Sequence, residues 1–211
     1  MDAKVVHVEM AGMRVVRDGY QLKAVLGSCV GVIVRDPQRK VCGLAHVMMP
    51  RCRDGDPSRG KYADTAVADL IEQVTPRGCG TAGLEAVLVG GARMFPGGNE
   101  GIAPVGDLNV AATRRALQKG KVRITYEDTG GTHGRAILFD NTTGEITIRT
   151  LQRPGEVQGA PDTERLRTAR HPKDGALRRP KDGGMPRLGA RPRPIPRGSA
   201  LHRPEPRIQG A

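Results

Sequence analysis

Short stretches in which apolar and polar residues alternate predict β-strands in the first quarter of the chain. A period of two places every second side chain on one face of an extended backbone. This period recurs in three places, at residues 5–10, 30–36 and 41–49. The polar residues 36–40 between the last two runs suit a turn, so we expect these two runs to pair as neighbouring strands.

Two later segments change to a helical period. Apolar residues recur at spacings of three and four over residues 63–74, and Pro76 closes the segment. A second helix is predicted over GDLNVAATRRALQKG, residues 106–120. Asp107 is its expected N-cap and Gly120 its expected stop.

The remaining periodic segments read as strands. Residues 85–90 form an apolar run that ends at two glycines, and residues 122–128 form another run. Residues 135–151 read as two strands around a turn at 141–144. Strands therefore outnumber helices and several follow one another directly, which favours a mixed α+β domain over a doubly wound parallel sheet.

Composition divides the chain after residue 151. Residues 1–150 hold 20 of the 34 Lys and Arg and 16 of the 22 Asp and Glu, so most of the net charge of +12 lies beyond them. The same remainder has 10 of the 16 prolines and no aromatic residue. Such a chain cannot bury enough apolar surface to offset its ordering entropy. We predict a folded domain over residues 1–151 and a disordered, Pro- and Arg-rich basic tail over residues 152–211.

Several classes of protein are disfavoured by what the sequence contains. No stretch approaches about 18 uninterrupted apolar residues, and charges near the start disfavour a signal peptide. A soluble, cytoplasmic protein without membrane insertion is expected. The four cysteines form no CxxC pair, and no P-loop or GxGxxG pattern occurs. We therefore expect reduced thiols and no structural zinc site.

Cys29 stands in a context that suits a nucleophile. Gly27 and Ser28 permit a sharp bend and expose consecutive N–H groups beside the thiol, which can hold an oxyanion. A nucleophilic cysteine needs a base, and His46 projects from the strand expected to pair with the strand after Cys29. The alternative, on these residues alone, is that Cys29 is a small buried hydrophobe and His46 a core histidine.

The other cysteines fit simpler roles. Cys42 lies in the middle of a predicted strand, and Cys79 lies between glycines with no acid or base nearby in sequence. Both are interpreted as small buried hydrophobic residues. Cys52 lies between Arg51 and Arg53 in a polar loop, where neighbouring cations favour a lowered thiol pKa.

Six motifs occur in order between about residues 5 and 150: LGSCVGVIVRD, GLAHVMMP, KYADTAV, GGARMF, VGDLNV and EDTGGTHGR. Together they resemble the chemoreceptor glutamine deamidases, the CheD family. The resemblance implies a mixed β-sandwich flanked by helices, with the cysteine-hydrolase fold of deamidating toxins. It also implies a protein-glutamine glutaminase that needs no metal or organic cofactor. The tail has no counterpart in this pattern.

The resemblance also implies roles for individual residues. Cys29 would attack the carboxamide of a receptor glutamine, and His46 would protonate the departing ammonia and activate water to hydrolyse the thioester. The family places a threonine six residues before the nucleophile as a third catalytic member, and this sequence has Lys23 there. An ammonium cannot accept an imidazole N–H, so Gln21 or a backbone carbonyl would have to orient His46.

The partners implied by the resemblance are the cytoplasmic helices of methyl-accepting chemotaxis receptors and a CheC-type phosphatase. A non-enzymatic adaptation module that binds both is therefore the alternative function.

Arg93, Met94 and Phe95, with the loop 51–61, are candidate substrate contacts. The basic tail could neutralise phosphates, but it has no aromatic residue for base stacking, so no specific nucleic acid is expected.

Overall fold

The computed structural model describes residues 3–53, 55–76, 78–94, 103–152 and 163–167. In this part the chain forms ten strands, two α-helices and one short 3-10 helix. The strands are β1 (Lys4–His7), β2 (Met13–Val16), β3 (Tyr20–Leu26), β4 (Val30–Asp36), β5 (Val41–Val47), β6 (Glu85–Gly90), β7 (Arg123–Thr129), β8 (Gly134–Asp140), β9 (Glu145–Leu151) and β10 (Thr163–Arg167). The helices are η1 (Arg59–Lys61), α1 (Ala63–Val74) and α2 (Val105–Lys119).

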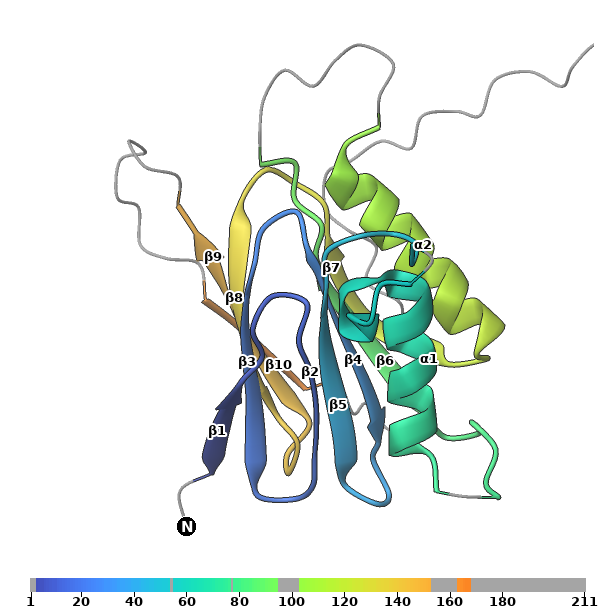
Figure 1. The fold of residues 1–211 in the computed structure, drawn as a ribbon. Coiled ribbons are helices and arrows are strands. Elements are labelled where there is room, and N and C mark those ends of the chain that lie inside the picture. Colours follow the sequence, from blue (N-terminus) through green and yellow to red (C-terminus); the bar gives the residue numbers. More distant parts are fainter. Residues whose placement is uncertain (1–2, 54, 77, 95–102, 153–162, 168–211) are drawn as a thin grey trace, which may run out of the picture. The chain divides into compact units, whose positions relative to one another are not determined.

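The strands form two mixed sheets of five strands each (Figure 1). The first sheet has the order β1-β3-β8-β9-β10, and the second has the order β2-β5-β4-β6-β7. β1 is parallel to β3 and β6 is parallel to β7, whereas the other neighbours are antiparallel. The first four strands alternate between the sheets, so the chain crosses from one sheet to the other between β3 and β4.

The inner faces of the two sheets form one of two hydrophobic cores. Leu22 and Ala24 of β3 and Phe139 of β8 belong to the same buried cluster as Ile33 of β4 and Leu44 of β5. All five side chains are fully buried. Because β3 is covered on one face only, its buried residues alternate with exposed ones. The sheets are therefore packed face to face, as in a β-sandwich.

Both α-helices cover the other face of the second sheet (Figure 1). The apolar stripe of α1, which includes Ala66 and Leu70, shares the second core with Val32 and Val34 of β4. Leu117 of α2 is buried in the same core. The predicted α+β class is confirmed, with a layer of helices on one side of the paired sheets. Neither helix within the described ranges is both long and apolar enough to cross a bilayer.

The helices follow the sequence prediction except at one end. α1 spans the predicted residues, and Gly120 ends α2 as expected. The prediction that Asp107 is the N-cap is wrong, because α2 already begins at Val105 and Pro104 is the N-cap. Asp107 lies in the first turn instead, where a carboxylate interacts favourably with the positive end of the helix dipole.

A strand is present at each of the six predicted places, although the first is shorter than expected, and three further strands, β2, β3 and β10, were not predicted. The expected strand at residues 5–10 ends at His7, because the chain turns at Ala11, whose φ is 59°. The alternation of β3 is hidden in the sequence because Ala24, Val25 and Leu26 are all apolar, although Val25 is 47% exposed.

The prediction that the whole tail lacks regular structure is wrong for residues 163–167. They form β10, which pairs antiparallel with β9 at the edge of the first sheet. Backbone pairing of this kind needs no apolar side chains, so composition did not reveal it. The rest of the predicted tail, residues 153–162 and 168–211, lies outside the described residues, and the boundary at residue 151 remains a prediction.

Helix α2 packs its first turn directly on the loop after β6, and this contact yields a stability test. A Cβ at Gly106 would lie 2.5 Å from Gly91 O and 2.9 Å from Ala92 O. Alanine favours a helix over glycine by about 1 kcal/mol, yet we expect Gly106→Ala to lower the free energy of unfolding by about 1–3 kcal/mol through overpacking. Urea denaturation measures this change. Gly80→Ala, where nothing lies within 4 Å, is the control; equal losses in both variants would contradict the prediction.

Candidate active site

The bend Gly27–Cys29 carries the chain from β3 in the first sheet to β4 in the second, at the upper end of the sandwich in Figure 1. The loop after β6 holds this bend through its backbone. Gly91 N–H donates to Cys29 O at 2.7 Å, and Ala92 N–H donates to Gly27 O at 2.9 Å. The predicted nucleophile therefore lies on a backbone segment fixed to both sheets.

Glycine is required where this loop approaches the bend most closely. Gly90 and Gly91 have φ values of 108° and 67°, which L-residues with a side chain rarely adopt. A Cβ at Gly90 would also overlap with Cys29 O, and a Cβ at Gly91 would overlap with the side chain of Val110. A larger residue at Gly90 would displace the backbone at Cys29, and one at Gly91 would displace helix α2 at Val110.

The glycine-rich loop between β7 and β8 completes this end of the sandwich. Arg93 N–H donates to Gly131 O at 2.8 Å, so the loop is bonded to the segment after β6. Arg135 stabilises the loop, because its guanidinium binds both carboxylate oxygens of Asp128, at 2.8 and 2.7 Å, and donates to Gly130 O at 2.9 Å. The described residues of the GGARMF and TGGTHGR segments are thus bonded to one another at this end of the sandwich.

Asn109 is a residue of this site that the sequence analysis did not single out. It lies on α2 and is fully buried. Its Nδ2 donates to Ser28 O at 3.2 Å and to Met48 O at 2.9 Å. Met48 follows His46 by two residues, so one amide joins the Cys29 bend to the end of the His46 strand. The VGDLNV motif contains Asn109, but only the packing of α2 on these two segments reveals its contacts.

Cys29 and His46 lie on the same face of the second sheet. The β4–β5 ladder places Gly31 opposite His46, and Cys29 lies two residues before Gly31. Both side chains face the core between the sheets, since Cys29 packs against that core and Leu44, two residues before His46, belongs to it. Diagonal neighbours of this kind are about 7–8 Å apart at Cα, within reach of long side chains. Within the described ranges no hydrogen bond joins the thiol and the imidazole.

The backbone orients the ring of His46, which is only 3% exposed. Its Nδ1 lies 3.5 Å from Val8 O, a long hydrogen bond. A carbonyl oxygen can only accept, so Nδ1 carries the proton and Nε2 of the neutral ring keeps its lone pair. Val8 is held in turn, because its N–H donates to Lys23 O at 2.8 Å.

Lys23 therefore connects to His46 through its backbone carbonyl and Val8, not through its ammonium. Its side chain is exposed on the outer face of β3, while His46 is buried on the inner side of the other sheet. The side chain of Gln21 donates to Asp140 at 2.8 Å. Gln21 and a backbone carbonyl were the two groups expected to orient His46 in place of the family's threonine. The backbone carbonyl of Val8 makes this contact, and Gln21 does not.

The surroundings of both residues favour their neutral forms. Burial raises the pKa of the Cys29 thiol, and a hydrogen bond from its own backbone N–H offsets only part of this shift. Burial lowers the pKa of His46, and the Val8 carbonyl and the Glu9 carboxylate offset it only partly. At neutral pH a thiol therefore faces an imidazole, which suits activation of the nucleophile by a general base.

The N–H groups of Gly27 and Ser28 form a candidate oxyanion hole. Among the described residues, none accepts a hydrogen bond from either group, whereas the carbonyls of the bend are all bonded. N–H donors without a protein acceptor beside a nucleophile can stabilise the charge of a tetrahedral intermediate.

Two of the three predicted substrate contacts border the bend, and Phe95 lies outside the described residues. A Cβ at Gly27 would lie 3.3 Å from Met94 Cγ, so the Met94 side chain lies against the bend. The exposed guanidinium of Arg93 pairs with Asp107 at 2.8 Å on the first turn of α2. This pair ties the segment after β6 to the helix that carries Asn109.

The loop 51–61 returns to the end of β5, close to the contact made by Asn109. Met48 N–H donates to Lys61 O at 2.8 Å. Within this loop, Cys52 N–H donates to the Asp64 carboxylate at 3.0 Å. The loop is thus anchored beside the strand that carries His46.

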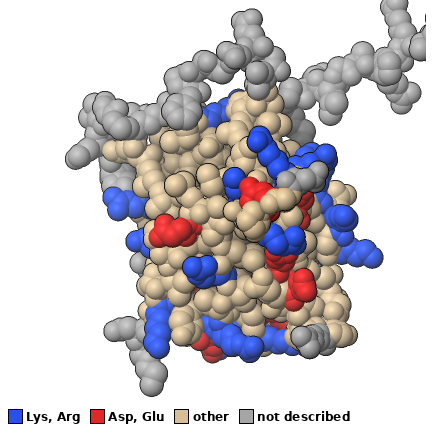
Figure 2. All heavy atoms as spheres, in the orientation of Figure 1, with Lys and Arg blue, Asp and Glu red and all other residues tan. Residues whose placement is uncertain are grey.

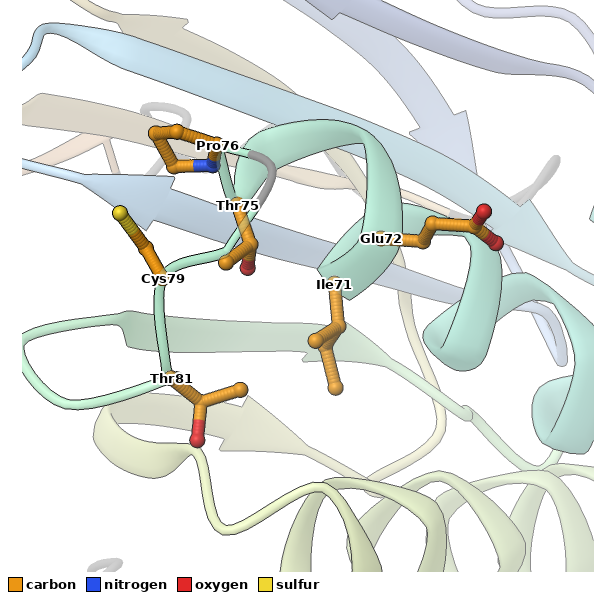
Figure 3. Close-up of a pocket in the computed structure, with 6 residues that line it drawn as sticks. All are labelled: Ile71, Glu72, Thr75, Pro76, Cys79 and Thr81. Carbon is orange, nitrogen blue, oxygen red and sulfur yellow. The ribbon is translucent and has the colours of Figure 1, made fainter.

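Two of the other cysteines, Cys42 and Cys79, differ from Cys29 in burial. Cys42 is buried as predicted, and burial raises its pKa to about 12. Cys79 is exposed, so its interpretation as a buried hydrophobe is wrong. It borders a hollow of about 290 Å³ at the end of α1 (Figure 3). The lining residues are Ile71, Glu72, Thr75, Pro76, Cys79 and Thr81.

That hollow offers no base for the Cys79 thiol. Its lining has no histidine, and Figure 3 shows the carboxylate of Glu72 pointing away from Cys79. In the part of the chain that the structure describes, no three His, Cys, Asp or Glu side chains gather in a way that could hold a metal ion. Cys29 therefore remains the candidate nucleophile.

Charges of both signs mix on the face shown in Figure 2. Charges of opposite sign also pair between neighbouring segments, as in Arg114 with Glu127 at 2.6 Å and Arg59 with Asp69 at 2.5 Å. This face therefore lacks an extended basic surface among its described residues. Most of the basic tail lies outside them.

Comparison with known proteins places these features in one family. The family model described as CheD chemotactic sensory transduction matches residues 48–150. A probable chemoreceptor glutamine deamidase CheD of Methanococcus vannielii is 40% identical over 146 residues, which covers 69% of this chain and 94% of the relative. The chemoreceptor glutamine deamidase CheD of Halalkalibacterium halodurans is 39% identical over 152 residues, covering 70% of this chain and 94% of the relative.

The neutral thiol of Cys29 predicts a specific pH dependence of alkylation. Because burial raises its pKa, the rate of carbamidomethylation by iodoacetamide should keep increasing as the pH rises from 7 to 9, without a plateau. Peptide mass spectrometry resolves each cysteine, and the exposed Cys79 serves as an internal reference. A plateau for Cys29 already at pH 7 would indicate a thiolate–imidazolium pair and contradict this assignment.

Proposed function

The chain belongs to the CheD family, and we propose that it deamidates side-chain carboxamides of glutamines in chemotaxis receptors, converting them to glutamates. One observation carries the proposal at the level of the site. The strand register brings Cys29 and His46 to one face of a sheet, in a chain whose relatives are named chemoreceptor glutamine deamidases. The enzyme is a protein-glutamine glutaminase, and Cys29 is its nucleophile.

In the first half of the reaction His46 acts as base and then as acid. Nε2 accepts the thiol proton while Sγ attacks the carboxamide carbon, and the carbonyl π electrons move to the oxygen. The N–H groups of Gly27 and Ser28 donate to that oxyanion. The intermediate collapses as His46 protonates the nitrogen, which leaves as ammonia. A thioester between Cys29 and the receptor remains.

In the second half a water molecule replaces the sulfur. Neutral His46 accepts a proton from water, and the hydroxide attacks the thioester carbon. The C–S bond breaks, the sulfur recovers a proton from His46, and the receptor carries a glutamate. The side chain has changed from neutral to negative, and the protein returns to its starting protonation state.

Lys23 does not replace the family's threonine through its side chain in this proposal. The orienting group is Val8 O, which fixes the proton of His46 on Nδ1 and leaves Nε2 for catalysis. Lys23 supports this arrangement with its carbonyl, which accepts from Val8 N–H. A backbone relay does not depend on the side chain at position 23, so lysine is compatible with turnover.

Three further parts of the interpretation rest on family resemblance. A CheC-type phosphatase is the proposed second partner. Apart from the resemblance, Arg93 and Met94 are proposed substrate contacts because they follow the loop that bonds to the Cys29 bend. The cysteine-hydrolase fold of deamidating toxins is the proposed structural relative. A non-enzymatic module would keep full receptor and phosphatase affinity in Cys29→Ala, which a pull-down with both partners measures.

Mass spectrometry of a receptor cytoplasmic fragment tests the reaction. Wild-type protein should raise the mass of each target glutamine by the difference between an amide and an acid, and Cys29→Ala should not. His46→Ala should lower the rate by about 10²–10⁴-fold, since it removes the acid–base group. Cys79→Ala is the matched control and should retain activity. Deamidation by Cys29→Ala, or no deamidation of a bound receptor by wild type, would overturn the proposal.

Substitution of Lys23 tests the backbone relay separately. Because its side chain is exposed and its carbonyl makes the contact, Lys23→Ala and Lys23→Thr should both leave kcat/KM for receptor deamidation close to the wild-type value. Steady-state kinetics on the same receptor fragment measures this. A large loss in Lys23→Ala that Lys23→Thr restores would show that the side chain takes part after all.

A further inference from the structure

Among the residues that the structure describes, Asn109 is the side chain that bonds to both segments carrying the proposed catalytic pair. Its two Nδ2 hydrogens serve two carbonyl oxygens, Ser28 O next to Cys29 and Met48 O two residues after His46. Since a carbonyl can only accept, the amide nitrogen must face these two partners, which settles the orientation of the side chain.

We propose that Asn109 is a positioning residue that sets the spacing between Cys29 and His46, an inference that rests on the proposed deamidase function. Asn109 acts through its hydrogen bonds to the backbone carbonyls of Ser28 and Met48. A displacement of reacting groups by about 1 Å can cost roughly 10²-fold in rate. A clamp across the open end of the β4–β5 pair limits such a displacement.

The two ends of this amide are used unequally. Asn109 Oδ1 is buried, and none of the described residues donates to it. A buried acceptor without a donor destabilises a folded protein, but an apolar residue at this position would leave Ser28 O and Met48 O without their donor. Asparagine therefore provides two donors on one rigid group.

The helix holds the clamp in place. Thr113 Oγ1 donates to Asn109 O at 2.8 Å, one turn further along α2. The first turn of α2 is in close contact with Gly91 through Gly106, and Arg93 binds Asp107 in the same turn. The base of the Asn109 side chain is therefore fixed to the same loop that bonds to the Cys29 bend.

Asn141 offers a closely matched control at the other end of the sandwich. It is 1% exposed, its Nδ2 donates to Lys40 O at 2.7 Å, and its Oδ1 also has no donor among the described residues. It lies in the turn between β8 and β9, beyond the end of β4 remote from Cys29. Seven residues of β4 separate the two ends, a span of about 20 Å.

The experiment compares Asn109→Ala, the milder Asn109→Ser and Asn141→Ala in the full-length protein. Each variant is assayed for thermal unfolding and for the kinetics of receptor deamidation. We expect comparable losses of thermal stability in Asn109→Ala and Asn141→Ala. Only the Asn109 variants should lose kcat, by about 10–100-fold with KM little changed, because misplacement affects the reacting groups and not receptor binding. Asn109→Ser provides the measurement if Asn109→Ala does not fold.

A second readout does not depend on the receptor. The rate of Cys29 alkylation by iodoacetamide is measured with and without His46→Ala in the wild-type, Asn109→Ser and Asn141→Ala backgrounds. The effect of His46→Ala on this rate should shrink in the Asn109 background and persist in the Asn141 background. Such a double-mutant cycle isolates the coupling between thiol and imidazole.

The outcomes separate the two proposals. Equal losses of kcat in the Asn109 and Asn141 variants, or an unchanged effect of His46→Ala in the Asn109 background, would overturn the positioning role while deamidation stands. A different result is that the effect of His46→Ala on Cys29 alkylation shrinks in the Asn109 background, while the wild-type protein does not deamidate a receptor that it binds. This result would overturn the deamidase function and support the positioning role alone.

Discussion

The crossing of the chain from β3 to β4 is the constraint on which the site depends. The bend Gly27–Cys29 must pass between two packed sheets, and there the carbonyls of Gly27 and Cys29 are bonded by the loop after β6. The contact is close enough that Gly90 and Gly91 admit no side chain. The position of the thiol is consequently set by the packing of the whole sandwich, and not by a flexible surface loop.

Much of this arrangement could be predicted because it follows from local periodicity. A period of two on either side of a short polar turn predicts an antiparallel pair, and that pairing brings Cys29 and His46 to one face. The helix Ala63–Val74 combines a continuous apolar stripe with a clear stop, and it lies where this stripe and Pro76 predicted it. Signals of this kind are contained in a single segment, so no knowledge of the rest of the fold is needed.

The features that were missed depend on contacts between distant segments. β10 forms by backbone pairing with β9, which leaves no trace in the composition of residues 163–167. Asn109 matters because of two carbonyls 61 and 81 residues away in the chain. Lys23 contacts Val8 through a carbonyl that every residue type has, so the identity of the residue could not reveal this contact.

Burial of Cys29 also affects how readily its thiol is oxidised by peroxides. Peroxides attack thiolates much faster than thiols, and the first product, a sulfenic acid, can be oxidised further without return. A thiol whose pKa is raised by burial presents little thiolate to such oxidants. The same burial thus favours slower oxidation of the Cys29 thiol by peroxides than of an exposed thiolate.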